Sequence, residues 1–207
     1  MNLISNLPTF IASIYLLAMI PGQGTAMILR QTLLFGSKIG SLTVLSYTAG
    51  FAIWGALSAI GLAGIFTQSP TAYSILKYVG VAYLLFLSFQ GFMQLSKSSS
   101  KFDFSKMEKI LKATPFKTGM TTSLTNAKAA VIAVAFLPAF VPEEFNLALG
   151  IFILGCIWSL TSMCWYLPLV ISIGKASNFF ANPKSRKVLT LISCFGLLFL
   201  AFLLAIS

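Results

Sequence analysis

Residues 39–76 read IGSLTVLSYTAGFAIWGALSAIGLAGIFTQSPTAYSIL, a stretch of 38 amino acids without one charged side chain. A helix needs roughly 20 apolar residues to cross the hydrocarbon core of a bilayer, so this stretch is long enough for a membrane span. Turn-forming residues cluster near its end, at Thr67-Gln68-Ser69-Pro70-Thr71. We therefore expect one transmembrane helix over about 40–64, followed by a hairpin at 67–71.

Other apolar blocks repeat this pattern along the chain. Four of them have the length of one span each, at about 7–30, 72–95, 118–140 and 188–206. The block at 145–174 is too long for one straight span and too short for two, which predicts a single tilted or kinked helix. The chain is 57% hydrophobic and only 9% charged, whereas a soluble domain carries about a quarter charged residues. The sequence thus predicts an all-α integral membrane protein with six transmembrane helices.

The basic residues set the orientation of these helices. Twelve of the 14 fall in the first, third and fifth connections. They are Arg30, Lys38, Lys97, Lys101, Lys106, Lys109, Lys112, Lys117, Lys175, Lys184, Arg186 and Lys187. Basic loops stay in the cytoplasm, so we expect both termini outside it (N-out/C-out), in the cytoplasmic (inner) membrane of a bacterium. Because the net charge of +10 comes from these loops, it does not indicate a nucleic-acid-binding protein.

The long basic connection at about 96–117 divides the single membrane domain, 1–207, into two halves. Repeat one covers about 1–95 and repeat two about 118–207, each with three predicted helices. Because three is odd, the second half must be inverted relative to the first. Inverted repeats are common in transporters, whose substrate site lies near the midplane at the repeat interface.

The first predicted helix is interrupted at Pro21-Gly22-Gln23-Gly24. Proline removes one helical hydrogen bond and clashes with the carbonyl four residues back, here that of Leu17. A freed carbonyl can accept from an ammonium group, and the amides that open the second half-helix can donate to an anion. Broken backbone at membrane depth must be satisfied by protein or a water-filled cavity. We regard these four residues as candidate substrate-binding residues; the alternative is a packing kink.

The fourth predicted helix carries Lys128 about halfway along its length. An intramembrane charge is expensive unless it is paired, which makes it a functional candidate by default. The alternative is that Lys128 snorkels to the cytoplasmic side. Asn126, two residues earlier, converges with Lys128 only if the helix is irregular there. Lys77, near the outer end of the third helix, is a second off-pattern charge, for which snorkelling and a pathway role both stay open.

Some chemistry is missing from the predicted spans. The chain has no histidine, and its Asp and Glu residues all fall in connections. A proton relay of the carboxylate or histidine type is therefore not expected. We also expect no metal site, because metal cations require carboxylate, imidazole or grouped thiolate ligands. The interpretation of the chain as a transporter includes no cofactor and no enzymatic activity.

Three stretches resemble the LysE/RhtB family of amino-acid and metabolite exporters. They are Pro21-Gly22-Gln23-Gly24 with the following Gly36-Ser37-Lys38-Ile39-Gly40, then Leu76-Lys77-Tyr78-Val79-Gly80-Val81-Ala82-Tyr83-Leu84, and Gly119 to Pro138 around Asn126-Ala127-Lys128. The resemblance covers nearly the whole chain and adds Tyr83 to the candidate substrate-binding residues. Departures are Gln23 and Ala127, where the family usually has proline, and Trp54, where many members have His or Asp. Without a proline at 127, a break in the fourth helix is less expected.

The leading hypothesis is a secondary exporter of a small amphoteric metabolite, an amino acid or derivative, driven by the proton gradient as the resemblance implies. Lys128 would pair with the substrate carboxylate, while Asn126, Gln23 and the broken backbone would supply hydrogen bonds. A neutral or anionic amino acid is favoured, because a dicationic one would leave a charge unpaired. The expected partners are this substrate and the lipid bilayer, and a homo-oligomer stays open. Alternatives are a thiol-electron relay using Cys156, Cys164 and Cys194, or a non-transporting scaffold or channel.

Overall fold

The computed structural model describes residues 3–19, 22–68, 70–96, 114–142, 144–172 and 182–206. In these ranges the chain is helical and contains no strand. The helices are α1 (Leu3–Met19), α2 (Gln23–Phe35), α3 (Ser37–Gln68), α4 (Pro70–Ser96), α5 (Pro115–Leu124), α6 (Ala127–Val131), the π-helical segment η2 (Ile132–Phe136), α7 (Leu137–Ala139), α8 (Leu147–Ile171) and α10 (Pro183–Ile206). Most of the basic connection, 97–113, lies outside the described residues.

Within these ranges, two helices are by themselves long and apolar enough to cross a membrane: α3 over Ser37–Gly61, and α8. Two bent pairs raise the total to four if each pair is one span. The α1–α2 pair bends by 61°, and the pair formed by α5 with Ala127–Ala139 bends by 54°. Helices α4 and α10 contain shorter apolar stretches, Tyr78–Met93 and Lys187–Phe199. The predicted hairpin is confirmed where α3 ends and α4 begins, and the 145–174 block forms one helix, α8.

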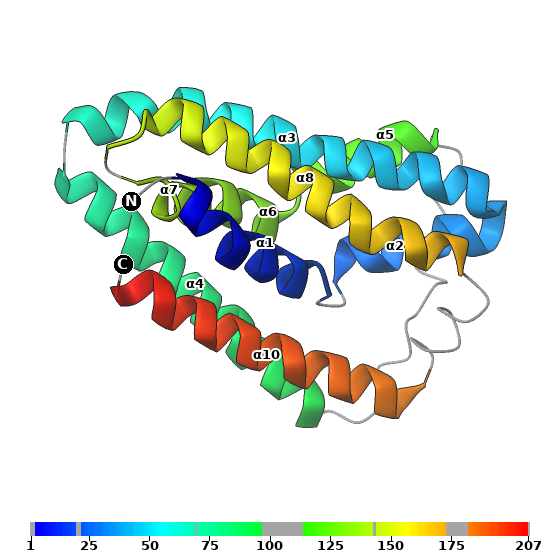
Figure 1. The fold of residues 1–207 in the computed structure, drawn as a ribbon. Coiled ribbons are helices and arrows are strands. Elements are labelled where there is room, and N and C mark those ends of the chain that lie inside the picture. Colours follow the sequence, from blue (N-terminus) through cyan, green and yellow to red (C-terminus); the bar gives the residue numbers. More distant parts are fainter. Residues whose placement is uncertain are drawn as a thin grey trace.

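The helices are arranged in pairs that join the two halves of the chain (Figure 1). The long helices α3 and α8 pack along each other, and α4 packs along α10. Helices α1, α6 and α7 lie between these two layers, whereas α5 packs along α3. The α2–α3 turn, the end of α4 and the start of α10 lie at one end of the molecule, whereas α1 begins and α10 ends at the other. Gly36 makes the tight α2–α3 turn, with a φ of 85° that favours glycine.

The α3–α8 pair is held together by a glycine on each helix. A Cβ atom added at Gly55 would lie 2.7 Å from the Cα of Gly155, and the reverse distance is also 2.7 Å. Small residues at a helix crossing let two backbones approach closely, which is how helices associate where apolar burial gives no driving force. This contact therefore fixes where the two long helices cross.

The fourth predicted helix is broken at Thr125–Asn126, contrary to what the absence of a proline at 127 suggested. The break does not need proline, because Asn126 has extended backbone and its Oδ1 accepts from the Lys128 backbone amide at 3.1 Å, which starts α6 as an N-cap. Further along, Leu137 N–H donates to Ile132 O, five residues back. The next π-type donor would be Pro138, which has no N–H, and Ser58 Oγ instead donates to Ala133 O at 2.6 Å.

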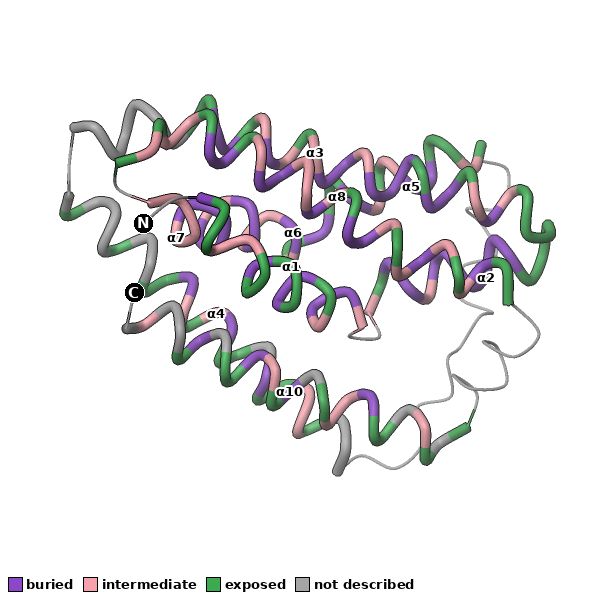
Figure 2. Tube along the Cα trace, in the orientation of Figure 1, coloured by how far each residue is buried: buried purple, intermediate pink, exposed green. Residues whose placement is uncertain are grey.

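Burial follows the pattern of a membrane protein (Figure 2). Large apolar side chains such as Phe86, Phe89, Phe195 and Phe199 are exposed on α4 and α10. Buried polar residues gather on α2, α3 and α5; they include Thr25, Thr32, Thr43, Ser46, Thr48, Thr118 and Ser123. Arg30 corrects one prediction: it lies within α2 and is 6% exposed, because α2 continues to Phe35 and leaves Gly36 as the connection. It was expected in a cytoplasmic loop.

Candidate functional site

A cavity of about 330 Å³ lies between the two layers of helices, close to both helix breaks. Its size is at the lower end of the range for small-molecule sites, about 300–1,000 Å³. It is lined by Gly22, Gln23, Gly24, Thr25, Tyr47, Tyr83, Gln90, Gly91, Thr125, Asn126, Ala127, Lys128, Tyr166, Thr190, Cys194 and Leu197. Among these lining residues there is one ammonium group and no carboxylate.

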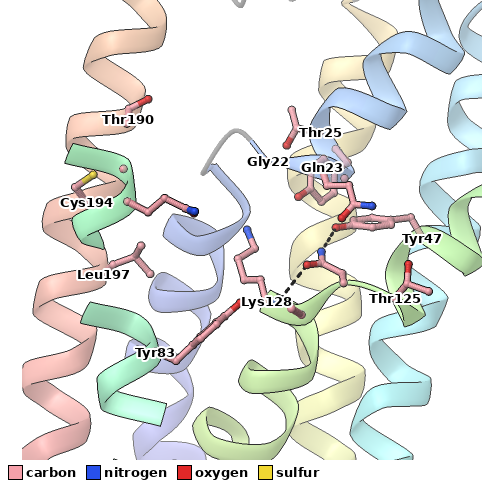
Figure 3. A pocket seen from close by; sticks show the side chains of 16 residues that line it. Gly22, Gln23, Thr25, Tyr47, Tyr83, Thr125, Lys128, Thr190, Cys194 and Leu197 are labelled. Atoms are coloured by element: carbon pink, nitrogen blue, oxygen red, sulfur yellow. Dashed lines mark hydrogen bonds between the residues drawn. The ribbon is translucent and has the colours of Figure 1, made fainter. Parts of the chain in front are cut away.

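The first break supplies Gly22, Gln23 and Gly24, three of the candidate substrate-binding residues, to the cavity wall (Figure 3). Pro21 lies outside the described residues. Gly22 precedes α2 with extended backbone, and its carbonyl accepts the first helical hydrogen bond, from Ala26 N at 3.0 Å. Gly24 is required for packing, because a Cβ there would collide with the hydroxyl of Tyr47. The start of α2 therefore lines the cavity with two glycines and with the side chains of Gln23 and Thr25.

Lys128 reaches across to the first break. Its Nζ donates to the carbonyl oxygen of Leu17 at 3.2 Å. This is the carbonyl that sequence reasoning identified as freed by Pro21, so the two anomalies of the halves do face each other. The side chain is half-buried and lines the cavity, and it does not snorkel to the surface. One of the three ammonium protons is used on Leu17, which leaves two to face the cavity.

Asn126 joins the second break to α3. Its Nδ2 donates to Tyr47 Oη at 3.0 Å, while its Oδ1 caps α6. Tyr47 is 1% exposed and its ring lies edge-on to that of Tyr166 on α8, with centroids 5.7 Å apart. The irregularity that their convergence requires is thus present, and Asn126 and Lys128 line the same cavity.

The opposite wall comes from α4 and α10. Tyr83, a candidate substrate-binding residue, lines the cavity from α4, as do Gln90 and Gly91. From α10 come Thr190, Cys194 and Leu197. The two helices are tied together here, since Ser88 Oγ donates to Cys194 O at 3.0 Å. Gln90 and Thr190 lie about two turns from the α4 end and the α10 start, so the cavity extends toward the end of the molecule that carries the basic connections.

The other residues singled out in the sequence are Lys77, Trp54 and the three cysteines. Lys77 is on α4, but its side chain lies outside the described residues. Trp54 is half-buried and donates from Nε1 to Ser123 O at 3.2 Å, without lining the cavity. The three cysteines are free, and only Cys194 reaches the cavity. In the part of the chain that the structure describes, no three His, Cys, Asp or Glu side chains come together to hold a metal ion.

Sequence reasoning missed Thr25, Tyr47 and Tyr166. Tyr47 and Tyr166 are tyrosines inside otherwise apolar stretches, and buried tyrosine hydroxyls usually have a hydrogen-bond partner. That signal could have selected them, but no single spacing in the sequence places them beside Gly24 and Asn126. Their position depends on the α3–α8 packing.

We expect Asn126→Ala to lower stability by about 1 kcal/mol through loss of the N-cap, and to reduce transport as well. The reason for the second effect is that the cap positions Lys128 and holds Tyr47. Asn146→Ala is the matched control, because Asn146 caps α8 through Leu149 N at 2.9 Å but is exposed and outside the cavity. Thermal unfolding in detergent and flux in vesicles would be compared. Equal transport loss in both variants would contradict a local role for Asn126.

Comparisons with known proteins match this chain over most of its length. The family model described as LysE type translocator matches residues 15–207. The membrane protein YrhP of Bacillus subtilis is 28% identical over 180 residues, covering 84% of this chain and 85% of that protein. Leucine efflux proteins of Salmonella choleraesuis and Salmonella typhimurium are each 27% identical over 195 residues, covering 94% of this chain and 91% of theirs. No solved structure matches the chain.

Proposed function

The chain belongs to the LysE type translocator family of membrane transport proteins, and we propose that it exports a neutral amino acid from the bacterial cytoplasm across the inner membrane. The observation that carries this proposal is the Lys128 ammonium group, which meets the broken first helix at the wall of a cavity of ligand size. An amino acid brings a carboxylate to this cation, and the site's hydroxyl and amide groups can hydrogen-bond to it.

We further propose six spans arranged as two inverted three-helix repeats. Helices α4 and α10 have 27 and 24 residues, which at 1.5 Å per residue exceeds the roughly 30 Å of a hydrocarbon core. Each half contains a bent pair, a long helix and a further helix, in that order. The α3–α8 and α4–α10 pairs each join corresponding helices, and the reciprocal Gly55–Gly155 contact is what a two-fold axis through the crossing would produce. The cavity then faces the cytoplasm.

The chemistry of the cavity supports a substrate with a neutral side chain. Leu197, Cys194 and Gly91 form an apolar part of the wall against which an aliphatic side chain can pack. The described lining residues offer no carboxylate to a second positive charge, so lysine and arginine are disfavoured. Relatives named leucine efflux protein agree with this chemistry.

Counterflow in vesicles containing the purified protein tests the proposal. Vesicles loaded with unlabelled L-leucine are expected to accumulate labelled L-leucine transiently and saturably, and those loaded with L-lysine are not. Flux that rises linearly with concentration would instead indicate a channel. If no neutral amino acid is moved at all, the protein would be a scaffold. Preferential, saturable lysine counterflow would overturn the substrate assignment.

A further inference from the structure

The two helix breaks differ in how their new N-termini are satisfied. At the second break, Asn126 caps α6 with its own side chain. At the first break, Gly22 offers no side chain to cap α2. Because the first helical bond runs from Ala26 N to Gly22 O, the amides of Gln23, Gly24 and Thr25 precede the helical pattern and have no acceptor among the described residues. The positive end of a 13-residue helix is thus open at the cavity wall.

A second, independent observation concerns the Thr25 side chain, which lies in the first turn of α2 and has an unpaired hydroxyl. Thr25 is 2% exposed, lines the cavity, and its Oγ1 has no hydrogen-bond partner among the described residues. It lies beside the hydroxyl of Tyr166, but the geometry does not make a hydrogen bond. A buried hydroxyl left unpaired costs free energy, which a ligand oxygen would recover. The other α2 threonine, Thr32, is equally buried but donates to Ile28 O at 2.8 Å.

We propose that the N-terminus of α2, together with the hydroxyls of Thr25 and Tyr166, is the subsite that anchors the substrate carboxylate. Lys128 then does not bind the carboxylate directly. It keeps its hydrogen bond to the Leu17 carbonyl and supplies the positive charge that balances the carboxylate within the cavity. This inference rests on the proposed function and refines the ligand class. The protein selects a free carboxylate. In the amide of the same amino acid an uncharged amide group replaces the carboxylate, so it lacks the negative charge that these donors favour.

Three variants in vesicles test the subsite with radiolabelled L-leucine, or with the neutral amino acid that the wild type moves fastest if it does not move leucine. Thr25→Val keeps the shape and removes the hydroxyl, so we expect its half-saturating concentration to rise roughly tenfold or more, the size expected for a lost hydrogen bond to a charged group. Thr25→Ser keeps a hydroxyl and is expected to stay within about threefold of the wild type, within the spread of such estimates. Thr32→Val, on the same helix and away from the cavity, is the matched control and is expected to be unchanged.

Competition separates the carboxylate from the amino group. For a leucine substrate, 4-methylpentanoate, which lacks the amino group, is expected to inhibit flux, whereas leucinamide is not. The inhibition by 4-methylpentanoate is expected to weaken in Thr25→Val by the same factor as leucine transport. Melting temperatures of the variants in detergent show whether each remains folded.

Each outcome bears on one claim. If the wild type moves no neutral amino acid saturably, the proposed function fails and the subsite fails with it. If the wild type transports but Thr25→Val matches Thr32→Val, or leucinamide competes as well as leucine, the subsite alone is overturned. If Thr25→Val does not fold, Thr25→Ser with the amide competition decides, because equal inhibition by leucinamide would still refute carboxylate selection.

Discussion

Lys128→Met is expected to reduce saturable export by at least about thirtyfold while leaving the fold intact. In the proposed mechanism the Lys128 ammonium group balances the charge of the substrate carboxylate, and leaving a desolvated charge without its counter-charge costs about 2–5 kcal/mol or more. Each 1.4 kcal/mol is a factor of ten, so this range spans about thirtyfold to several thousandfold. Initial rates of amino-acid flux in vesicles would measure the loss.

The stability of Lys128→Met is expected to stay the same or to increase, whereas its export decreases. Lys128 carries a half-buried charge whose described partner is one carbonyl oxygen, so a methionine of similar length should be neutral or stabilising. A melting temperature at or above that of the wild type, together with lost export, would separate a transport defect from misfolding. Lys117→Met is the control, because Lys117 is exposed on α5 and does not line the cavity. Export retained by Lys128→Met would remove the ammonium group from the transport mechanism.

Gly55→Ala is expected to lower the free energy of unfolding by about 1–3 kcal/mol, the cost of overpacking a tight contact. The added methyl group would lie 2.7 Å from the Gly155 backbone, and a backbone atom cannot move aside as a flexible side chain can. The helices α3 and α8 must therefore separate along their length. Denaturant titration of the purified protein in detergent would measure the change, and Gly155→Ala should give a similar value.

Gly61→Ala provides the matched control on the same helix. A Cβ at Gly61 meets no atom within 4 Å, so the substitution should be neutral or stabilising by up to about 1 kcal/mol, since alanine is the better helix former. Opposite signs for the two variants are the expected result. If both variants behave alike, the Gly55–Gly155 crossing does not hold the two long helices together.

The long apolar helices and the two partners of the contact between Lys128 and the first helix break could be predicted from the sequence. Apolar length predicts α3 and α8 because helices are the simplest way to satisfy backbone in a bilayer. Proline chemistry predicts that Leu17 loses a hydrogen bond, and the cost of a buried charge predicts that Lys128 seeks an acceptor; the structure joins these two groups. Both inferences depend on local chemistry that each residue carries wherever it is placed.

What sequence reasoning missed depends on contacts between distant segments. The break before α6 needs no proline because Asn126 caps the helix and is itself held by Tyr47, 79 residues away in the sequence. Arg30 was placed in a loop because charge usually marks a connection, yet α2 continues past it. Tyr47 and Tyr166 become site residues only through the packing of α3 on α8. The spacing of residues in a single sequence does not show which helices pack together, so these contacts could not be predicted.

The Lys128 ammonium group in the cavity makes the proposed carrier sensitive to the membrane potential. With a zwitterionic amino acid, the empty and loaded sites carry the same charge, so that the substrate itself adds no net charge to the movement. When the carrier changes between its inward-open and outward-open conformations, the cavity opens to the other aqueous side, and the electrical potential at Lys128 changes with it. The electrostatic energy of its one positive charge then changes by up to about 2.3 kcal/mol per 100 mV of membrane potential. An inside-negative potential therefore favours the conformation open to the cytoplasm, the one that loads substrate for export. De-energised cells would lose this bias even if the substrate gradient were unchanged.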